Sequence, residues 1–119
     1  LEMRVEIPTS ANIGDDITAT ITITNPNAVT DLSDLALTFF APAGMEILNT
    51  SENDDLTHTD VRDDRIYYYF NLDKKSSKTF TVKMNATFAG RYTMPAVRCE
   101  AMYDGSVYYV VPAKTITVK

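Results

Sequence analysis

Two long segments alternate strictly between apolar and polar residues, and this pattern constrains the fold more than any other feature. From Ile17 to Thr24 every odd position is apolar and every even position is Thr. Between Thr79 and Phe88 the apolar positions are Phe80, Val82, Met84, Ala86 and Phe88. A period of two residues places successive side chains on opposite faces of a β-strand. Both segments are therefore predicted strands with one face in a core and the other in water.

Shorter segments repeat the pattern, and turn residues separate them. Further strands are predicted at 3–7, 35–39, 66–70, 107–111 and 115–118, and over most of 91–104. No segment shows a helical period of 3.6 residues. Strands at this spacing predict a single all-β domain over residues 1–119, an antiparallel β-sandwich of about seven to nine strands in two sheets. The polar, acidic segment Asn49–Asp64 is expected to be a long loop with room for one short strand.

Composition excludes several classes of function. The 119 residues carry a formal net charge of −5, which argues against nucleic-acid binding because phosphate contacts need clustered Lys and Arg. No apolar run approaches the ~20 residues of a membrane-spanning helix, so the domain is not expected to insert into a membrane. The chain opens with Leu1-Glu2-Met3, and we expect it to be a fragment of a larger protein, in which any export signal would lie upstream.

The sequence offers no set of catalytic groups. His58 is the only histidine and no Gly-x-Ser-x-Gly elbow is present, so a nucleophilic triad is not supported. The only cysteine, Cys99, is predicted to face inward with Val97 and Ala101, where a thiol is unreactive. We therefore expect a domain that is not an enzyme and needs no cofactor.

An acidic segment around His58 invites comparison with metal sites. The neighbouring carboxylates are those of Glu52, Asp54, Asp55, Asp60, Asp63 and Asp64. Their spacing matches neither the calcium-loop pattern nor the zinc-binding helix pattern. A solvated acidic segment is the favoured interpretation, and no metal site is expected.

The segment Met102-Tyr103-Asp104 carries apolar residues at a predicted strand end, where polar residues are usual, and this makes it the most informative segment for function. Strand ends at turns are usually polar, yet two large apolar side chains stand here beside an acid and a glycine. Strand parity directs Met102 outward, which predicts a surface that another domain covers. The alternative is a strand end that folds back on the domain's own core, and the pattern alone does not choose between them.

Aromatic residues on predicted strand 66–70 are weaker interface candidates. Tyr68 is expected in the core, whereas Tyr67 and Tyr69 are expected on the outer face, where aromatic residues often mark interfaces. Ordinary strand tyrosines are the more economical interpretation. Arg65, in the charged run before this strand, is expected mainly to form surface ion pairs.

Several segments together resemble one family. They are Leu35-Ala36-Leu37-Thr38, Pro42-Ala43-Gly44-Met45-Glu46-Ile47, Val61-Arg62-Asp63-Asp64-Arg65-Ile66-Tyr67, Ala89-Gly90-Arg91-Tyr92 and the run from Pro95 to Asp104. In this order they resemble the C-terminal macroglobulin-like domain of bacterial alpha-2-macroglobulins, from about Ile7 to Val118 of this chain. The Arg-Asp-Asp-Arg and Glu-Ala-Met-Tyr-Asp motifs are the most specific parts of the resemblance.

The resemblance implies a fibronectin- or macroglobulin-like sandwich within a large periplasmic protein, usually lipid-anchored to the inner membrane. Such proteins trap proteases covalently through a thioester in a separate domain. Their Cys-x-Glu-Gln motif is absent here, because Cys99-Glu100-Ala101-Met102 lacks the Gln. By the resemblance, Met102, Tyr103 and Asp104 would shield that thioester, and Tyr69 and Arg65 would be weaker members of the same interface. The expected partners are the thioester domain of the same polypeptide and, through the full-length protein, target proteases.

A second interpretation needs no protease trap. An immunoglobulin- or fibronectin-like module of an exported adhesin or polysaccharide-processing protein would share the alternating strands. Its contacts would then lie on Tyr67 and Tyr69.

Overall fold

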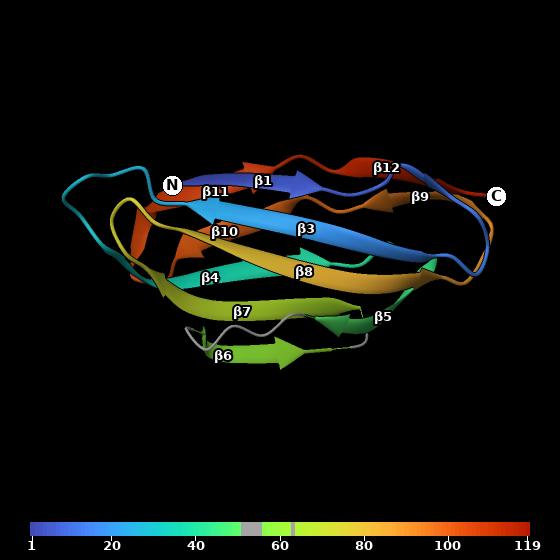
Figure 1. The fold of residues 1–119 in the computed structure, drawn as a ribbon, viewed down its shortest axis with the longest axis horizontal. Coiled ribbons are helices and arrows are strands. Elements are labelled where there is room, and N and C mark those ends of the chain that lie inside the picture. The colour runs from blue at the N-terminus through green and yellow to red at the C-terminus, as the bar shows by residue number, and fades with distance from the viewer. Residues whose placement is uncertain (51–55, 63) are drawn as a thin grey trace.

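Strands form all the regular structure that is described for this chain. The computed structural model describes residues 1–50, 56–62 and 64–119, and in these residues it contains twelve strands and no helix. The predicted all-β, antiparallel sandwich is confirmed. Figure 1 shows two layers of strands that run along the long axis of an elongated molecule of 47 × 25 × 20 Å.

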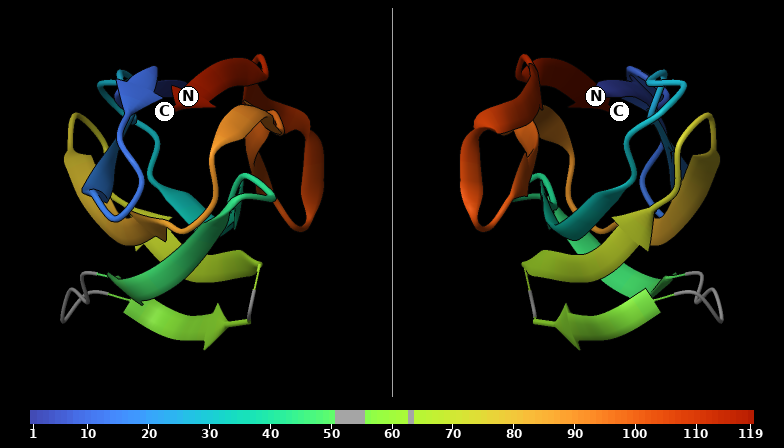
Figure 2. Two further views of the ribbon diagram at one scale, coloured as in Figure 1. Left: turned by 90° about the vertical axis from the view of Figure 1, so that its right-hand side faces the viewer. Right: turned by 90° about the vertical axis from the view of Figure 1, so that its left-hand side faces the viewer.

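Two sheets form the layers of the sandwich. The first has the order β1 (Glu2–Glu6), β3 (Asp16–Thr24), β8 (Ser77–Ala86), β5 (Met45–Thr50). The second has the order β11 (Asp104–Val111), β10 (Val97–Ala101), β4 (Leu32–Phe40), β7 (Arg65–Leu72), β6 (Leu56–Val61). Every pair within these two sheets is antiparallel. The end views in Figure 2 show the two layers curving around a shared interior.

A third, smaller sheet closes one end of the sandwich. It has the order β2 (Ser10–Ala11), β12 (Lys114–Val118), β9 (Gly90–Met94), and β2 pairs with β12 in parallel. In Figure 1 this sheet lies at the end that carries the C-terminus. The β10–β11 turn lies at the opposite end, beside the segment that connects β3 to β4.

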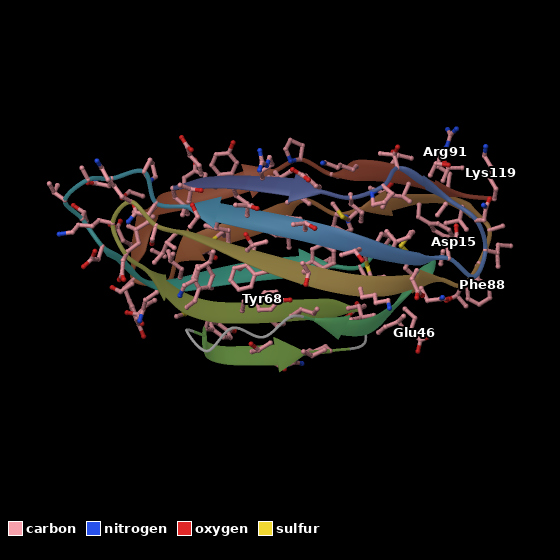
Figure 3. The ribbon with its side chains drawn as sticks, in the orientation of Figure 1. Asp15, Glu46, Tyr68, Phe88, Arg91 and Lys119 are labelled. Atoms are coloured by element: carbon pink, nitrogen blue, oxygen red, sulfur yellow. The ribbon has the colours of Figure 1, made fainter. Side chains whose placement is uncertain are left out.

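The core fills with the inward residues of the alternating strands. Ile17, Ala19, Ile21 and Ile23 of β3 are almost fully buried, as their alternation predicts. Across the interior, the ring of Phe80 lies 4.6 Å from that of Tyr68, measured between centroids. Figure 3 shows Tyr68 pointing from β7 into the space between the layers. The predicted core position of Tyr68 is confirmed.

The segment Asn49–Asp64 differs from its prediction as a loop. Two strands enter it, because β5 extends to Thr50 and β6 spans Leu56–Val61. Both are edge strands of their sheets, and edge strands tolerate polar residues that an inner strand would bury. The described residues form twelve strands in three sheets, which is more than the seven to nine strands in two sheets that alternation predicts.

Three aromatic side chains are exposed where strict alternation along a strand would not leave them all exposed. Phe88 is 65% exposed, although it continues the apolar face of β8, because that strand ends at Ala86. The N–H of Thr87 donates to the carbonyl of Gly44 and the chain turns away from the core. Tyr108 and Tyr109 are both exposed, since β11 is an edge strand whose two faces are only partly covered.

None of the residues that the structure describes belongs to a helix long and apolar enough to cross a membrane.

Candidate functional site

The candidate site is a tight turn formed by Met102 and Tyr103. It joins β10 to β11, and its base is closed by the pairing of Ala101 with Asp104. Met102 is 46% exposed and Tyr103 is 86% exposed. The chain therefore does not fold these two side chains back onto its own core. The predicted outward direction of Met102 agrees with this geometry.

A bulge in the neighbouring strand holds the backbone of the turn. The N–H of Met102 donates to the carbonyl of Asp34 at 2.9 Å. Asp34 has φ of 55°, and its N–H donates to Oδ1 of Asn71 at 2.9 Å. The register of β4 against β7 shifts here, so that Ser33 and Asp34 together lie opposite Asn71. The position of the turn is thus set by two residues that are distant from it in the sequence.

Asp104 stabilises the other side of the turn. Its Oδ1 accepts hydrogen bonds from the hydroxyl of Ser106 at 2.6 Å and from the N–H of Ser106 at 3.1 Å. These bonds favour the ionised carboxylate and hold the pKa of Asp104 below its usual value. They also shape the start of β11, where the register jumps from the Glu100–Tyr108 pair to the Ala101–Asp104 pair.

We expect Ser106→Ala to raise the pKa of Asp104 toward the ordinary aspartate value of about 4. The hydrogen bond from the Ser106 hydroxyl is the largest cause of the lowered pKa of Asp104. The hydrogen bond from the backbone N–H of Ser106 remains in the variant. A lowered folded-state pKa contributes stability above the ordinary value, and this contribution is lost as pH falls through the lowered value. Carboxyl-carbon NMR titration measures the change. Asp64, whose pKa is lowered by Arg65, is the internal control and keeps its titration curve. An unchanged Asp104 titration would contradict this account of the turn.

A shallow hollow of about 250 Å³ lies beside the turn. The hairpin contributes Tyr103, Asp104 and Val107 to its lining, and the facing side is residues 30–34. Tyr103 therefore projects over a recess and not over packed core. Most of the Tyr103 side chain is therefore exposed.

Tyr69 and Arg65 lie at different distances from the turn. Tyr69 is half-buried and pairs with Ala36, which in turn pairs with Glu100 next to the turn. Arg65 lies four residues from Tyr69 along β7, which is roughly 13 Å at strand spacing, and it pairs with Phe40. Tyr69 thus lies two strands away from Glu100, with β4 between them, and Arg65 lies toward the other end of β7.

Arg65 is occupied by local partners. Its guanidinium donates to the carboxylate of Asp64 at 3.0 Å and to the hydroxyl of Tyr67 at 3.4 Å, and it lies over the ring of Phe40. The carboxylate raises the pKa of Arg65 above its usual value. These contacts match the predicted surface ion pairing.

Cys99 is fully buried in β10, as strand parity predicts. Burial raises the pKa of its thiol to about 12, and the nearby Glu100 adds to the effect. A thiol with that pKa carries almost no thiolate at neutral pH, so it is a poor nucleophile.

The acidic segment around His58 is only partly described. Glu52, Asp54, Asp55 and Asp63 lie outside the described residues, and for His58 the structure gives the backbone pairing with Tyr69. Within the described part of the chain, no group of three or more His, Cys, Asp or Glu side chains is placed to hold a metal ion.

Sequence reasoning missed the residues that support the turn. Asp104-Gly105-Ser106 does carry a local signal, since Asp commonly bonds the backbone two residues later. Asp34 and Asn71 carry no such signal, because 37 residues separate them and only the sheet brings them together.

Comparisons with known proteins identify a family for this all-β chain. The family model of the bacterial alpha-2-macroglobulin MG10 domain matches residues 2–105. An alpha-2-macroglobulin of Rickettsia conorii is 29% identical over 109 residues, which cover 82% of this chain and 6% of that protein. The chain thus spans a small part of the curated relative that it matches.

Solved structures show the same fold. Native alpha-2-macroglobulin from Escherichia coli, spanning domain MG7 to the C-terminus, superposes with a TM-score of 0.84 at 17% identity, covering 99% of this chain and 23% of that one. Salmonella alpha-2-macroglobulin reacted with methylamine gives 0.82 at 16% identity, covering 98% and 9%. The chain belongs to the family of bacterial alpha-2-macroglobulin MG10 domains.

Proposed function

We propose that this chain is a non-catalytic domain of a longer bacterial alpha-2-macroglobulin, in which it docks on the thioester domain and shields the thioester from water. In this proposal Met102 and Tyr103 form the cap and Asp104 keeps the turn in shape. Target proteases are met by the full-length protein and not by this domain alone. The proposed location is the periplasm, with a lipid anchor supplied by the rest of the polypeptide.

One observation carries the proposal: Met102 and Tyr103 are exposed on a turn whose backbone is hydrogen-bonded to the neighbouring strand β4. Neither Met102 nor Tyr103 belongs to the buried core, and the hydrogen bond from Met102 N–H to the carbonyl of Asp34 attaches the turn to β4. An apolar cap that excludes water slows hydrolysis of a reactive bond. Adaptable Met and amphipathic Tyr are residue types that suit such a contact.

Membership of the alpha-2-macroglobulin family supports a docking partner for Met102 and Tyr103 within the same polypeptide. A domain that makes up a few per cent of its relative has most of the polypeptide available for docking. Salmonella alpha-2-macroglobulin has been solved after reaction with methylamine, and a small amine would attack a bond of the thioester class. Tyr69, two strands away from Glu100 in the same sheet, extends the proposed interface, whereas Arg65 is a peripheral member.

The test uses the full-length parent protein. In Met102→Ala/Tyr103→Ala we expect the thioester to hydrolyse about tenfold faster without protease, which corresponds to ~1.4 kcal/mol of lost shielding. The released thiol is titrated over time. Phe88→Ala is the control, because it removes an exposed aromatic side chain at the opposite end of the domain, as Figure 3 shows. Hydrolysis at the parental rate in the double variant would refute the cap.

The alternative of an accessory module in an adhesin or polysaccharide-processing protein is not favoured. The family match extends from residue 2 to 105 and includes the turn. An accessory module would give no reason for Met102 and Tyr103 to lie outside the core.

A further inference from the structure

The five methionines of this chain differ sharply in exposure. Four are buried, with exposed fractions of 6% for Met3, 8% for Met45 and 0% for both Met84 and Met94. Met102 is 46% exposed. Oxygen transfer to a thioether requires contact between the sulfur and the oxidant, so exposure governs the relative rates.

The other sulfur in the chain does not compete with Met102. Cys99 is fully buried between the layers, and its thiol is held in the unreactive protonated form. Hydroperoxides react with the thiolate and not with the thiol. Within this chain, an oxidant therefore meets Met102 before any other sulfur.

The hydrogen bonds that hold the turn do not involve the side chain of Met102. The turn is held by the bond from Met102 N–H to the carbonyl of Asp34, by the pairing of Ala101 with Asp104, and by the bonds from Ser106 to the Asp104 carboxylate. A sulfoxide at this position changes the chemistry of the surface while the core stays intact. The change is large, because a flexible apolar side chain becomes a polar one.

We propose that Met102 is a reversible oxidation site of this domain, with hydroperoxides as the class of oxidant. The peroxide O–O bond breaks, one oxygen atom bonds to the thioether sulfur, and the other leaves as water or as an alcohol. Sulfur loses two electrons and the peroxide gains them. A methionine sulfoxide reductase reverses the step with a dithiol, which becomes a disulfide as the oxygen leaves as water.

The consequence for docking rests on the proposed function. A sulfoxide oxygen at the cap needs hydrogen-bond partners that an apolar contact does not supply. Oxidation of the undocked domain would therefore weaken its contact with the thioester domain, and reduction would restore it.

The test treats the 119-residue chain with hydrogen peroxide and follows each methionine by peptide mass spectrometry. We expect Met102 to gain oxygen about tenfold faster than any buried methionine, with an unchanged thermal unfolding midpoint after the fast phase. Met102→Leu removes the fast phase. Met45→Leu keeps it, and is the matched control at the most exposed of the four buried positions. Oxidation of Met45 or another buried methionine as fast as Met102 would overturn the proposal.

A second arm separates this inference from the proposed function. In the full-length parent, docking should slow the oxidation of Met102 relative to the isolated chain. If Met102 is oxidised fast in both, the oxidation site stands and the docked cap is contradicted. If Met102 is not oxidised first in the isolated chain, the oxidation site is wrong whatever the parent does.

Discussion

Phe80→Ala is expected to lower the free energy of unfolding by about 3–5 kcal/mol. Phe80 is fully buried in β8, and its ring lies 4.6 Å from that of Tyr68 and 5.1 Å from that of Phe70, between centroids. Removing the ring leaves a cavity between two sheets whose paired strands cannot close around it. Domains of this size have a total stability of about 5–15 kcal/mol, so a large share would be lost. Urea unfolding followed by far-UV circular dichroism measures the change.

Phe88→Ala is the matched control for this prediction. The substitution is identical and the sequence places both residues on one apolar face, yet Phe88 is 65% exposed. We expect its cost to stay within about 0.5 kcal/mol, as for other surface substitutions. Equal losses in the two variants would mean that the end of β8 is described incorrectly.

Gly44→Ala is expected to lower the free energy of unfolding by about 1–3 kcal/mol through overpacking. A Cβ at Gly44 would overlap ring atoms Cζ and Cε2 of Tyr92. The ring cannot move aside freely, because the hydroxyl of Tyr92 donates to the carbonyls of Ala89 at 2.9 Å and Phe88 at 3.2 Å. Thermal and urea unfolding both report the loss.

Gly105→Ala is the control, since a Cβ there meets no atom within 4 Å. Its cost should be within about 0.5 kcal/mol. In the double variant Gly44→Ala/Tyr92→Ala the overlap disappears, so the combined loss should be smaller than the sum of the single losses. Additive losses would contradict a direct contact between residue 44 and the ring of Tyr92.

This contact also explains part of the family resemblance in physical terms. Pro42-Ala43-Gly44 and Ala89-Gly90-Arg91-Tyr92 are far apart in the sequence, and the fold packs Tyr92 against Gly44 and close to Gly90. Gly90 has φ of 148°, which favours glycine at that position as well. The two motifs are therefore one structural feature.

The local alternation of apolar and polar residues was sufficient to predict the strands that bury one face in the core. Alternation in β3 and β8 identified the inward residues up to Ala86, because burial of one face is the strongest constraint on a strand of period two. It failed at the edges. β5 and β6 carry polar residues that read as loop, and the exposure of Phe88 follows from a strand end that alternation does not mark.

The candidate turn was predictable in part. The apolar pair at a strand end is visible in the sequence, and so is its resemblance to the family motif. Its support by Asp34 and Asn71 was not predictable, because a bulge in β4 and a side chain of β7 meet only when the five-stranded sheet forms.

The sequence by itself determined the all-β class, most strand positions and the identity of the exposed turn, because each depends on side chains within one short segment. The tertiary structure alone decided how many sheets form, where β8 ends and what holds Met102 in place. Those features depend on hydrogen bonds and ring contacts between strands that lie tens of residues apart, and no local pattern records such pairings.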